Sequence, residues 1–139
     1  GFTAFSIEYK GKYYIITAGH CVENEYGKFT NFRFKANFSD RWIYPKLLVY
    51  ENDWINSNDY AIFFSDKIDN GLNIGEYDGH TIVLGSYLLK LNLIKDTQKT
   101  SIKGESGSPV INLNGEVTAM FIGGFTQINK ITQAIDNLK

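Results

Sequence analysis

Three side chains of this sequence could together catalyse acyl transfer: a histidine, an aspartate and a serine. His20 directly follows the apolar run "YYIITAG", Asp59 stands where a polar loop meets the strand-like run "YAIFF", and Ser106 lies in "GESGSP". Serine becomes a nucleophile when a base takes its proton and an acid orients that base. These residues therefore indicate His20 as base, Asp59 as orienting acid and Ser106 as nucleophile. Gly104 lets the backbone turn, so that the N–H groups of Gly104 and Ser106 can form an oxyanion hole.

The order of these residues along the chain separates the known solutions to this chemistry. The α/β-hydrolase order needs a histidine after the nucleophile, and no histidine follows Ser106. A subtilisin-like order needs an aspartate before the base, which here would require His80 in place of His20. Taken alone, His20 could be a structural histidine, Asp59 a strand-initiating carboxylate and Ser106 a turn residue. Their joint order, His then Asp then Ser, favours catalysis.

The elements that must position these residues are mostly strands, because aromatic and β-branched residues recur with a period near two. Lys10-Gly11 indicates a tight hairpin, and Asn114-Gly115 indicates a second hairpin between two strands. In "FRFKANF" the apolar residues Phe32, Phe34, Ala36 and Phe38 alternate and would share one face of a strand. We expect the other strands at 2–9, 12–18, 42–50, 60–64, 81–84, 87–94 and within 110–124. Many short strands predict an all-β fold, closed or sandwiched.

One segment breaks the strand pattern near the C-terminus. Ile131, Ala134, Ile135 and Leu138 recur at helical spacing, which predicts a short C-terminal helix packed on the strands. Residues 65–80 are rich in Gly, Asn and Asp and are expected to connect two halves of one domain. A chain of 139 residues is long enough for one well-buried core and short for two.

Composition excludes several classes of function. A formal net charge of -1 leaves no electrostatic footprint for nucleic acid, and no apolar stretch approaches the length of a membrane span. His20 and His80 stand far apart and no paired ligand spacing appears, so neither a metal nor another cofactor is expected. Cys21 is the only cysteine, and we expect a free, buried thiol on the strand face opposite His20. The N-terminus lacks the features of a signal peptide.

The three motifs together resemble those of the chymotrypsin-like serine peptidases. "TAGHC" carries His20, "NDYAI" carries Asp59 and "GESGSP" carries Ser106, in the order of that family. "YKGKYYIITAGHC" and "NDYAIF" look like the small bacterial streptogrisin-like branch, whereas "GESGSPVIN…GEV" is similar to the glutamyl endopeptidase branch. The resemblance covers nearly the whole chain.

What the resemblance implies is a chymotrypsin-like double β-barrel with the active site between the barrels. The first barrel would span residues 1–68, the second 78–128, and the closing helix 129–138. His20 would accept the proton of the attacking serine and later protonate the leaving amine. Asp59 would set the imidazole tautomer, and the N–H groups of Gly104 and Ser106 would bind the oxyanion. The implied partner is a polypeptide substrate.

The resemblance also places the residues of the primary specificity (S1) pocket. Thr100 and Ser101 should lie near its base, with Gly123 and Gly124 along one wall. No acid occupies the base, which disfavours cleavage after Lys or Arg. Where glutamyl endopeptidases carry a carboxylate-reading histidine this chain has Phe121. An acidic preference through Ser101 or Lys103 and a medium-sized apolar or polar preference both stay open.

Two alternatives to a free endopeptidase follow from departures from the family pattern. Ile122 replaces a serine that in many relatives bonds the catalytic aspartate, and the chain is shorter than most members, so a chymotrypsin-fold pseudoenzyme or binding module is the first alternative. The second is a cis-acting protease that releases itself from a precursor polyprotein or propeptide. Secretion or release from a larger precursor is the favoured origin.

Overall fold

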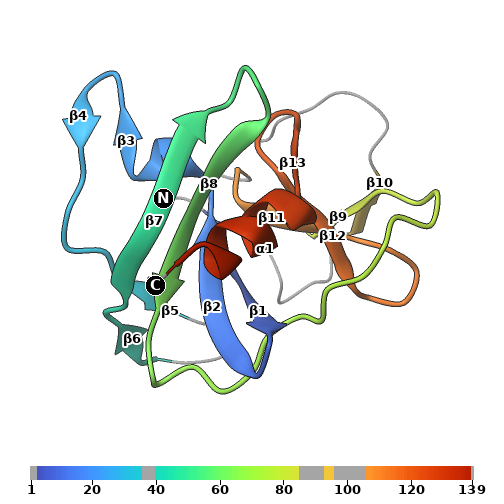
Figure 1. The fold of residues 1–139 in the computed structure, drawn as a ribbon, viewed down its shortest axis with the longest axis horizontal. Helices are drawn as coiled ribbons and strands as arrows, with labels where there is room; N and C mark the ends of the chain where they lie inside the picture. The colour runs from blue at the N-terminus through green and yellow to red at the C-terminus, as the bar shows by residue number, and fades with distance from the viewer. Residues whose placement is uncertain (1–2, 36–39, 85–92, 96–105, 139) are drawn as a thin grey trace.

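The described part of the chain forms two larger antiparallel sheets, two small two-stranded ribbons and a C-terminal helix (Figure 1). The computed structural model describes residues 3–35, 40–84, 93–95 and 106–138. The first sheet has the order β1-β2-β8-β7 and the second β10-β9-β11-β12-β13. The first contains β1 (Phe5–Tyr9), β2 (Lys12–Thr17), β8 (Asn58–Phe64) and β7 (Lys46–Asp53). The second contains β10 (Leu93–Lys95), β9 (Ile82–Leu84), β11 (Ser108–Ile111), β12 (Val117–Phe121) and β13 (Phe125–Gln127).

The remaining elements are short. Two small ribbons pair β3 (Glu23–Asn24) with β4 (Gly27–Lys28) and β5 (Phe34–Lys35) with β6 (Trp42–Ile43). A 3₁₀ turn, η1, spans Gly19–Cys21, and the helix α1 spans Ile128–Asp136. The expected all-β class with a C-terminal helix is therefore confirmed. Neither sheet closes on itself over the described residues, so the double barrel and its division of the chain stay predictions.

Both predicted hairpins are confirmed. Lys10 and Gly11 join β1 to β2 with φ of 52° and 79°, the left-handed pair that a two-residue hairpin of matching twist requires. The second hairpin joins β11 to β12 through a longer loop around Asn114-Gly115. There the Asn112 side chain accepts hydrogen bonds from the N–H groups of Asn114 and Glu116. A short polar side chain thus organises the loop from within.

Other predicted elements differ at their bounds. The strand expected over 42–50 is divided into β6 and β7, because Pro45 has no N–H to continue a ladder. In the segment 32–38, Phe32 and Phe34 both pack edge-on against Phe63, as one shared face requires, whereas Ala36 and Phe38 lie outside the described residues. The helix begins one residue early and ends at Asp136, so Leu138 lies beyond it and is exposed.

The larger hydrophobic core joins both sheets. Strand β8 alternates its side chains: Tyr60 and Ile62 face this core, whereas Ala61 and Phe63 face a smaller cluster on the other side. Residues from β1, β2, β12 and α1 complete the larger core, and α1 contacts β8, β12 and β13 (Figure 1). The helix therefore packs where the two sheets meet.

The expected connection at 65–80 pairs with both halves. Leu72 exchanges backbone hydrogen bonds with β1, donating to Ser6 O and accepting from Glu8 N. Three residues later the same segment pairs with Val117 of β12. The connection is consequently a hydrogen-bonded bridge between the sheets.

We expect Ile131→Ala in α1 to lower the free energy of unfolding by about 2–5 kcal/mol, because the side chain is fully buried in the shared core. Gln133→Ala, at an exposed position of the same helix, is the matched control and should change it by less than about 0.5 kcal/mol. Urea denaturation followed by circular dichroism measures both. Equal losses in the two variants would contradict the packing described for α1.

Candidate active site

His20 is presented by a sharp turn at the end of β2. The strand ends at Thr17, and η1 follows with hydrogen bonds from Cys21 N to Ala18 O and from Val22 N to Gly19 O. Gly19 permits this turn, because a Cβ there would lie 1.7 Å from Glu51 O and 2.9 Å from Asp59 Oδ1. Only glycine lets the turn approach β7 and β8 so closely.

Asp59 is fully buried and faces His20. It occupies the second position of β8, the strand next to β2 in the first sheet. One carboxylate oxygen accepts a hydrogen bond from the His20 backbone N–H at 2.8 Å, and the other lies 2.6 Å from His20 Nδ1. A buried carboxylate is costly without such partners. The structure therefore brings together the predicted base and its predicted orienting acid.

This pairing determines the chemistry of the imidazole. An ionised carboxylate can only accept hydrogen bonds, so Asp59 favours the neutral tautomer that carries its proton on Nδ1 and a lone pair on Nε2. The hydrogen bond to Asp59 raises the pKa of His20 above its ordinary value, with burial acting in the opposite direction. The side chain is 37% exposed. His20 can thus exchange protons with a bound molecule through Nε2.

Ser106 lies beside the strand that leads to His20. Its carbonyl accepts a hydrogen bond from Thr3 N at 3.4 Å, and the next residue, Gly107, donates to Phe121 O at 2.8 Å. Gly107 has φ of 95°, and a Cβ there would meet Thr3 O and the hydroxyl of Thr17. The turn that carries Ser106 is consequently packed on the end of β2. No hydrogen bond joins the Ser106 hydroxyl to His20 in the described part of the chain.

The predicted specificity residues divide into two groups. Thr100 and Ser101 lie outside the described residues, as does Gly104 of the predicted oxyanion hole. Gly123 and Gly124 form the exposed tip of the β12–β13 hairpin, which is closed by a hydrogen bond from Ile122 N to Gly124 O. On either side of this tip the rings of Phe121 and Phe125 stack edge to face, with centroids 6.0 Å apart.

Thr126 is a site residue that the sequence reasoning missed. Its side chain is fully buried, and its hydroxyl accepts a hydrogen bond from Asp59 N at 3.3 Å and donates to Asp59 O at 3.2 Å. Ile122 stands where many chymotrypsin-like peptidases have a serine that bonds the catalytic aspartate. Here its side chain is buried in the larger hydrophobic core. The only signal for this contact in the sequence was the presence of a threonine in β13. Its partner Asp59 lies 67 residues away in the chain.

Two further titratable side chains lie apart from the pair. Cys21 is a free thiol, partly buried against the shared core instead of fully buried as expected, and burial raises its pKa to about 11. A thiol of that pKa is protonated at neutral pH and is a poor nucleophile. His80 is exposed and contacts Asp78 at 3.3 Å. It therefore offers no second base for the site.

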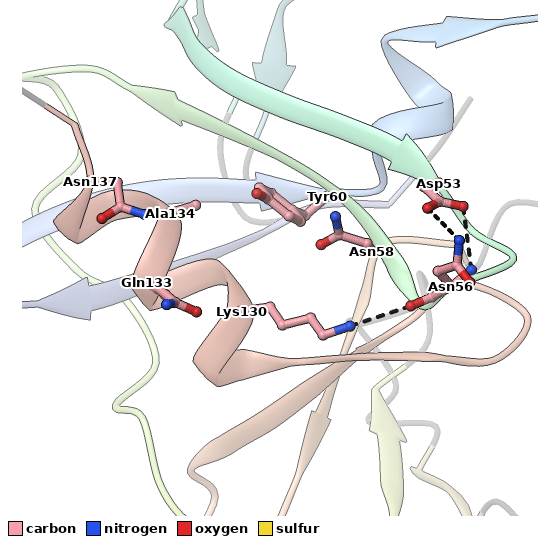
Figure 2. Close-up of a pocket in the computed structure, with 8 residues that line it drawn as sticks. All are labelled: Asp53, Asn56, Asn58, Tyr60, Lys130, Gln133, Ala134 and Asn137. Carbon is pink, nitrogen blue, oxygen red and sulfur yellow. Dashed lines mark hydrogen bonds between the residues drawn. The ribbon is translucent and has the colours of Figure 1, made fainter.

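A pocket of about 350 Å³ lies next to α1, away from the His20–Asp59 pair. Figure 2 shows its lining, which includes Asn58 and Tyr60 of β8 and Lys130 of α1. Asn58 and Tyr60 alternate with Asp59 along β8, so their side chains point to the opposite face of the sheet. This pocket is accordingly separate from the candidate active site.

Among the described residues, no group of His, Cys, Asp and Glu side chains is arranged to hold a metal ion. The same residues contain no helix with the length and apolar character that crossing a membrane requires. Comparison with known proteins leaves the chain without an assigned relative, because no protein-family model and no curated protein matches it.

We expect Gly19→Ala to break the His20–Asp59 pair, because the added methyl group would overlap Glu51 O and crowd the carboxylate. Such overpacking lowers the free energy of unfolding by about 1–3 kcal/mol. Gly11→Asn is the matched control: a Cβ there meets nothing within 4 Å, and asparagine tolerates a positive φ. Thermal denaturation and the NMR titration of His20 measure the effect. A normal His20 titration in Gly19→Ala would contradict the close approach.

Proposed function

We propose that this protein is a serine endopeptidase with a chymotrypsin-like arrangement of its two sheets. The observation that carries the proposal is the buried Asp59 carboxylate, which accepts hydrogen bonds from both the Nδ1 and the backbone N–H of His20. A histidine held in this tautomer by a buried acid has Nε2 available as a general base. The turn carrying Ser106 packs on the strand that ends just before His20, which favours Ser106 as the nucleophile.

The proposed reaction proceeds through an acyl-enzyme. Ser106 Oγ attacks the carbonyl carbon of the scissile peptide bond while His20 Nε2 takes the hydroxyl proton. The tetrahedral intermediate collapses as His20 protonates the leaving amine, which breaks the C–N bond. Water then attacks the ester with His20 again as base, and the acid product leaves with Ser106 restored. Asp59 stabilises the imidazolium formed in each half-reaction.

The oxyanion donors and the specificity pocket belong to the same proposal. The N–H groups of Gly104 and Ser106 are the proposed oxyanion hole, and Thr100 and Ser101 the proposed base of the S1 pocket. Gly123 and Gly124 are the proposed wall. They follow β12 after one intervening residue, Ile122, and β12 pairs with β11, which begins two residues after Ser106. Backbone N–H groups are suited to this role because they need no reorganisation during the reaction.

A second candidate function is a binding module of the same fold that does not cleave its ligand. The observation that favours it is the lack of a hydrogen bond between the Ser106 hydroxyl and His20 over the described residues. Catalytic hydrogen bonds are frequently long before substrate binds. The peptidase therefore remains the function that the buried Asp59–His20 pair supports best.

A fluorophosphonate probe should label the folded protein at Ser106, because the probe reacts with a serine hydroxyl activated by a neighbouring base. Peptide mapping by mass spectrometry locates the adduct. Ser106→Ala and His20→Ala should abolish labelling, while Ser108→Ala, two residues along the same segment, should retain it. An unlabelled folded protein, or an adduct at another residue, would refute the peptidase.

Peptidase activity should rise with pH as His20 loses its proton, because only the neutral imidazole acts as base. Asp59 stabilises the protonated ring, so the midpoint of kcat/KM should lie above the ordinary imidazole value of about 6.5. Asp59→Asn should move the NMR titration midpoint of His20 to lower pH and reduce kcat by roughly 10³- to 10⁴-fold. His80→Gln assigns the resonances, since the chain has two histidines. An unchanged His20 midpoint in Asp59→Asn would contradict the pairing.

A further inference from the structure

A buried hydroxyl links the second sheet to the backbone of Asp59. Thr126, in the middle of β13, is fully buried, and its Oγ1 lies 3.3 Å from Asp59 N and 3.2 Å from Asp59 O. A hydroxyl both donates and accepts, so this one side chain satisfies the two main-chain groups of Asp59 at once. The contact spans the two sheets, because Asp59 belongs to β8.

The link occurs where the first sheet leaves Asp59 without a strand on one side. Strand β2 pairs with β8 from Phe63 to Ala61 and then ends at Thr17, so it does not extend as far as Asp59. Beyond that point the chain turns away into η1 to present His20. Buried main-chain N–H and C=O groups need partners. The Thr126 hydroxyl bonds the N–H and C=O of Asp59 in place of β2, which could reach them only if it continued as a strand instead of turning into η1.

A second contact from the C-terminal segment holds the loop that precedes Asp59. Lys130 Nζ of α1 lies 3.3 Å from the carbonyl oxygens of both Asn56 and Ser57. Figure 2 shows the lysine reaching from the helix toward this loop. Ser57 has φ of 57°, a conformation that costs energy for a residue with a side chain. Segment 126–130 therefore contacts β8 and its preceding loop at two places.

We infer that Thr126 is a positioning residue that holds Asp59 at the correct place for His20, an inference that rests on the proposed function. The Asp59 side chain has only two torsions, so the place of its backbone decides where its carboxylate lies. With N and O of Asp59 both bonded to Thr126, a shift of β8 would break two buried hydrogen bonds.

The same hydroxyl connects Asp59 with the sheet that packs against the turn of Ser106, the proposed nucleophile. Thr126 pairs with Met120 in β12, and the neighbouring Phe121 accepts the hydrogen bond from Gly107, next to Ser106. Strand pairing and hydrogen bonds thus connect the turn of Ser106, through β12 and β13, with the backbone of Asp59. Thr126 is the point at which this connection crosses from one sheet to the other.

The test compares Thr126→Val with Thr126→Ser. Valine has the shape of threonine without the hydroxyl, whereas serine keeps the hydroxyl. We expect Thr126→Val to move the NMR titration midpoint of His20 toward that of Asp59→Asn, and to lower kcat by about 10- to 100-fold with KM nearly unchanged. Thr126→Ser should restore both properties. A His20 titration and kcat like those of the unmodified chain in folded Thr126→Val would overturn the inference.

The NMR titration separates this inference from the proposed function, because it needs no catalysis. Asp59 is the charged side chain that shifts the pKa of His20 among the described residues. A shifted midpoint in Thr126→Val, in a protein that cleaves nothing, would support the positioning role and refute the peptidase. A peptidase-active protein whose Thr126→Val variant has an unshifted His20 midpoint would support the peptidase and refute the positioning role.

Lys130→Met keeps the inference testable if Thr126→Val does not fold. Among the described residues the Lys130 side chain bonds only to the carbonyls of Asn56 and Ser57, and Lys130 is partly exposed, so this variant should fold. We expect a smaller shift of the His20 midpoint in the same direction. With Thr126→Val unfolded, an unshifted midpoint in Lys130→Met would overturn the positioning role of the C-terminal segment.

Discussion

The arrangement of this protein depends on one buried carboxylate. Asp59 is fully buried, and removing an ionised group from water costs several kcal/mol unless hydrogen bonds replace its hydration. Two such hydrogen bonds reach the Asp59 carboxylate, and both come from His20, one from its ring and one from its backbone N–H. The 3₁₀ turn that follows β2 places both of these donors against the Asp59 side chain. Gly19 is the residue that lets that turn come close enough.

The second constraint is the distance between the sheets. In the proposed reaction Ser106, just before β11, must reach His20, just after β2, which requires the two sheets to keep one relative position. The bridge at Leu72 and Val117, the shared core under α1 and the hydroxyl of Thr126 all act on that position. Protein interiors are close-packed and have low compressibility, so packed elements resist small displacements. Packing and hydrogen bonding between the sheets are therefore part of the site.

Several features of the fold and of the candidate site were predictable because their signals are local. The hairpin at Lys10-Gly11 follows from residues that accept a positive φ, and the helix follows from apolar spacing. The division of the strand expected over 42–50 was missed although its signal is local, since Pro45 has no N–H to donate. The roles of Gly19 and Thr126 were not, because each depends on a contact with a distant segment. A glycine and a threonine carry no sign of what they will touch.

Sequence alone determined which side chains are available for acyl-transfer chemistry and in which order they occur along the chain. His20, Asp59 and Ser106 follow from residue type and the motifs around them. Tertiary structure decided that His20 Nδ1 lies 2.6 Å from Asp59 Oδ2 and that the Asp59 carboxylate is fully buried. It also decided that the Thr126 hydroxyl bonds the backbone of Asp59 where β2 does not extend to pair with it. The physical reason is that burial and hydrogen-bond partners are properties of neighbours in space, and those neighbours come from segments 39 and 67 residues apart in the chain.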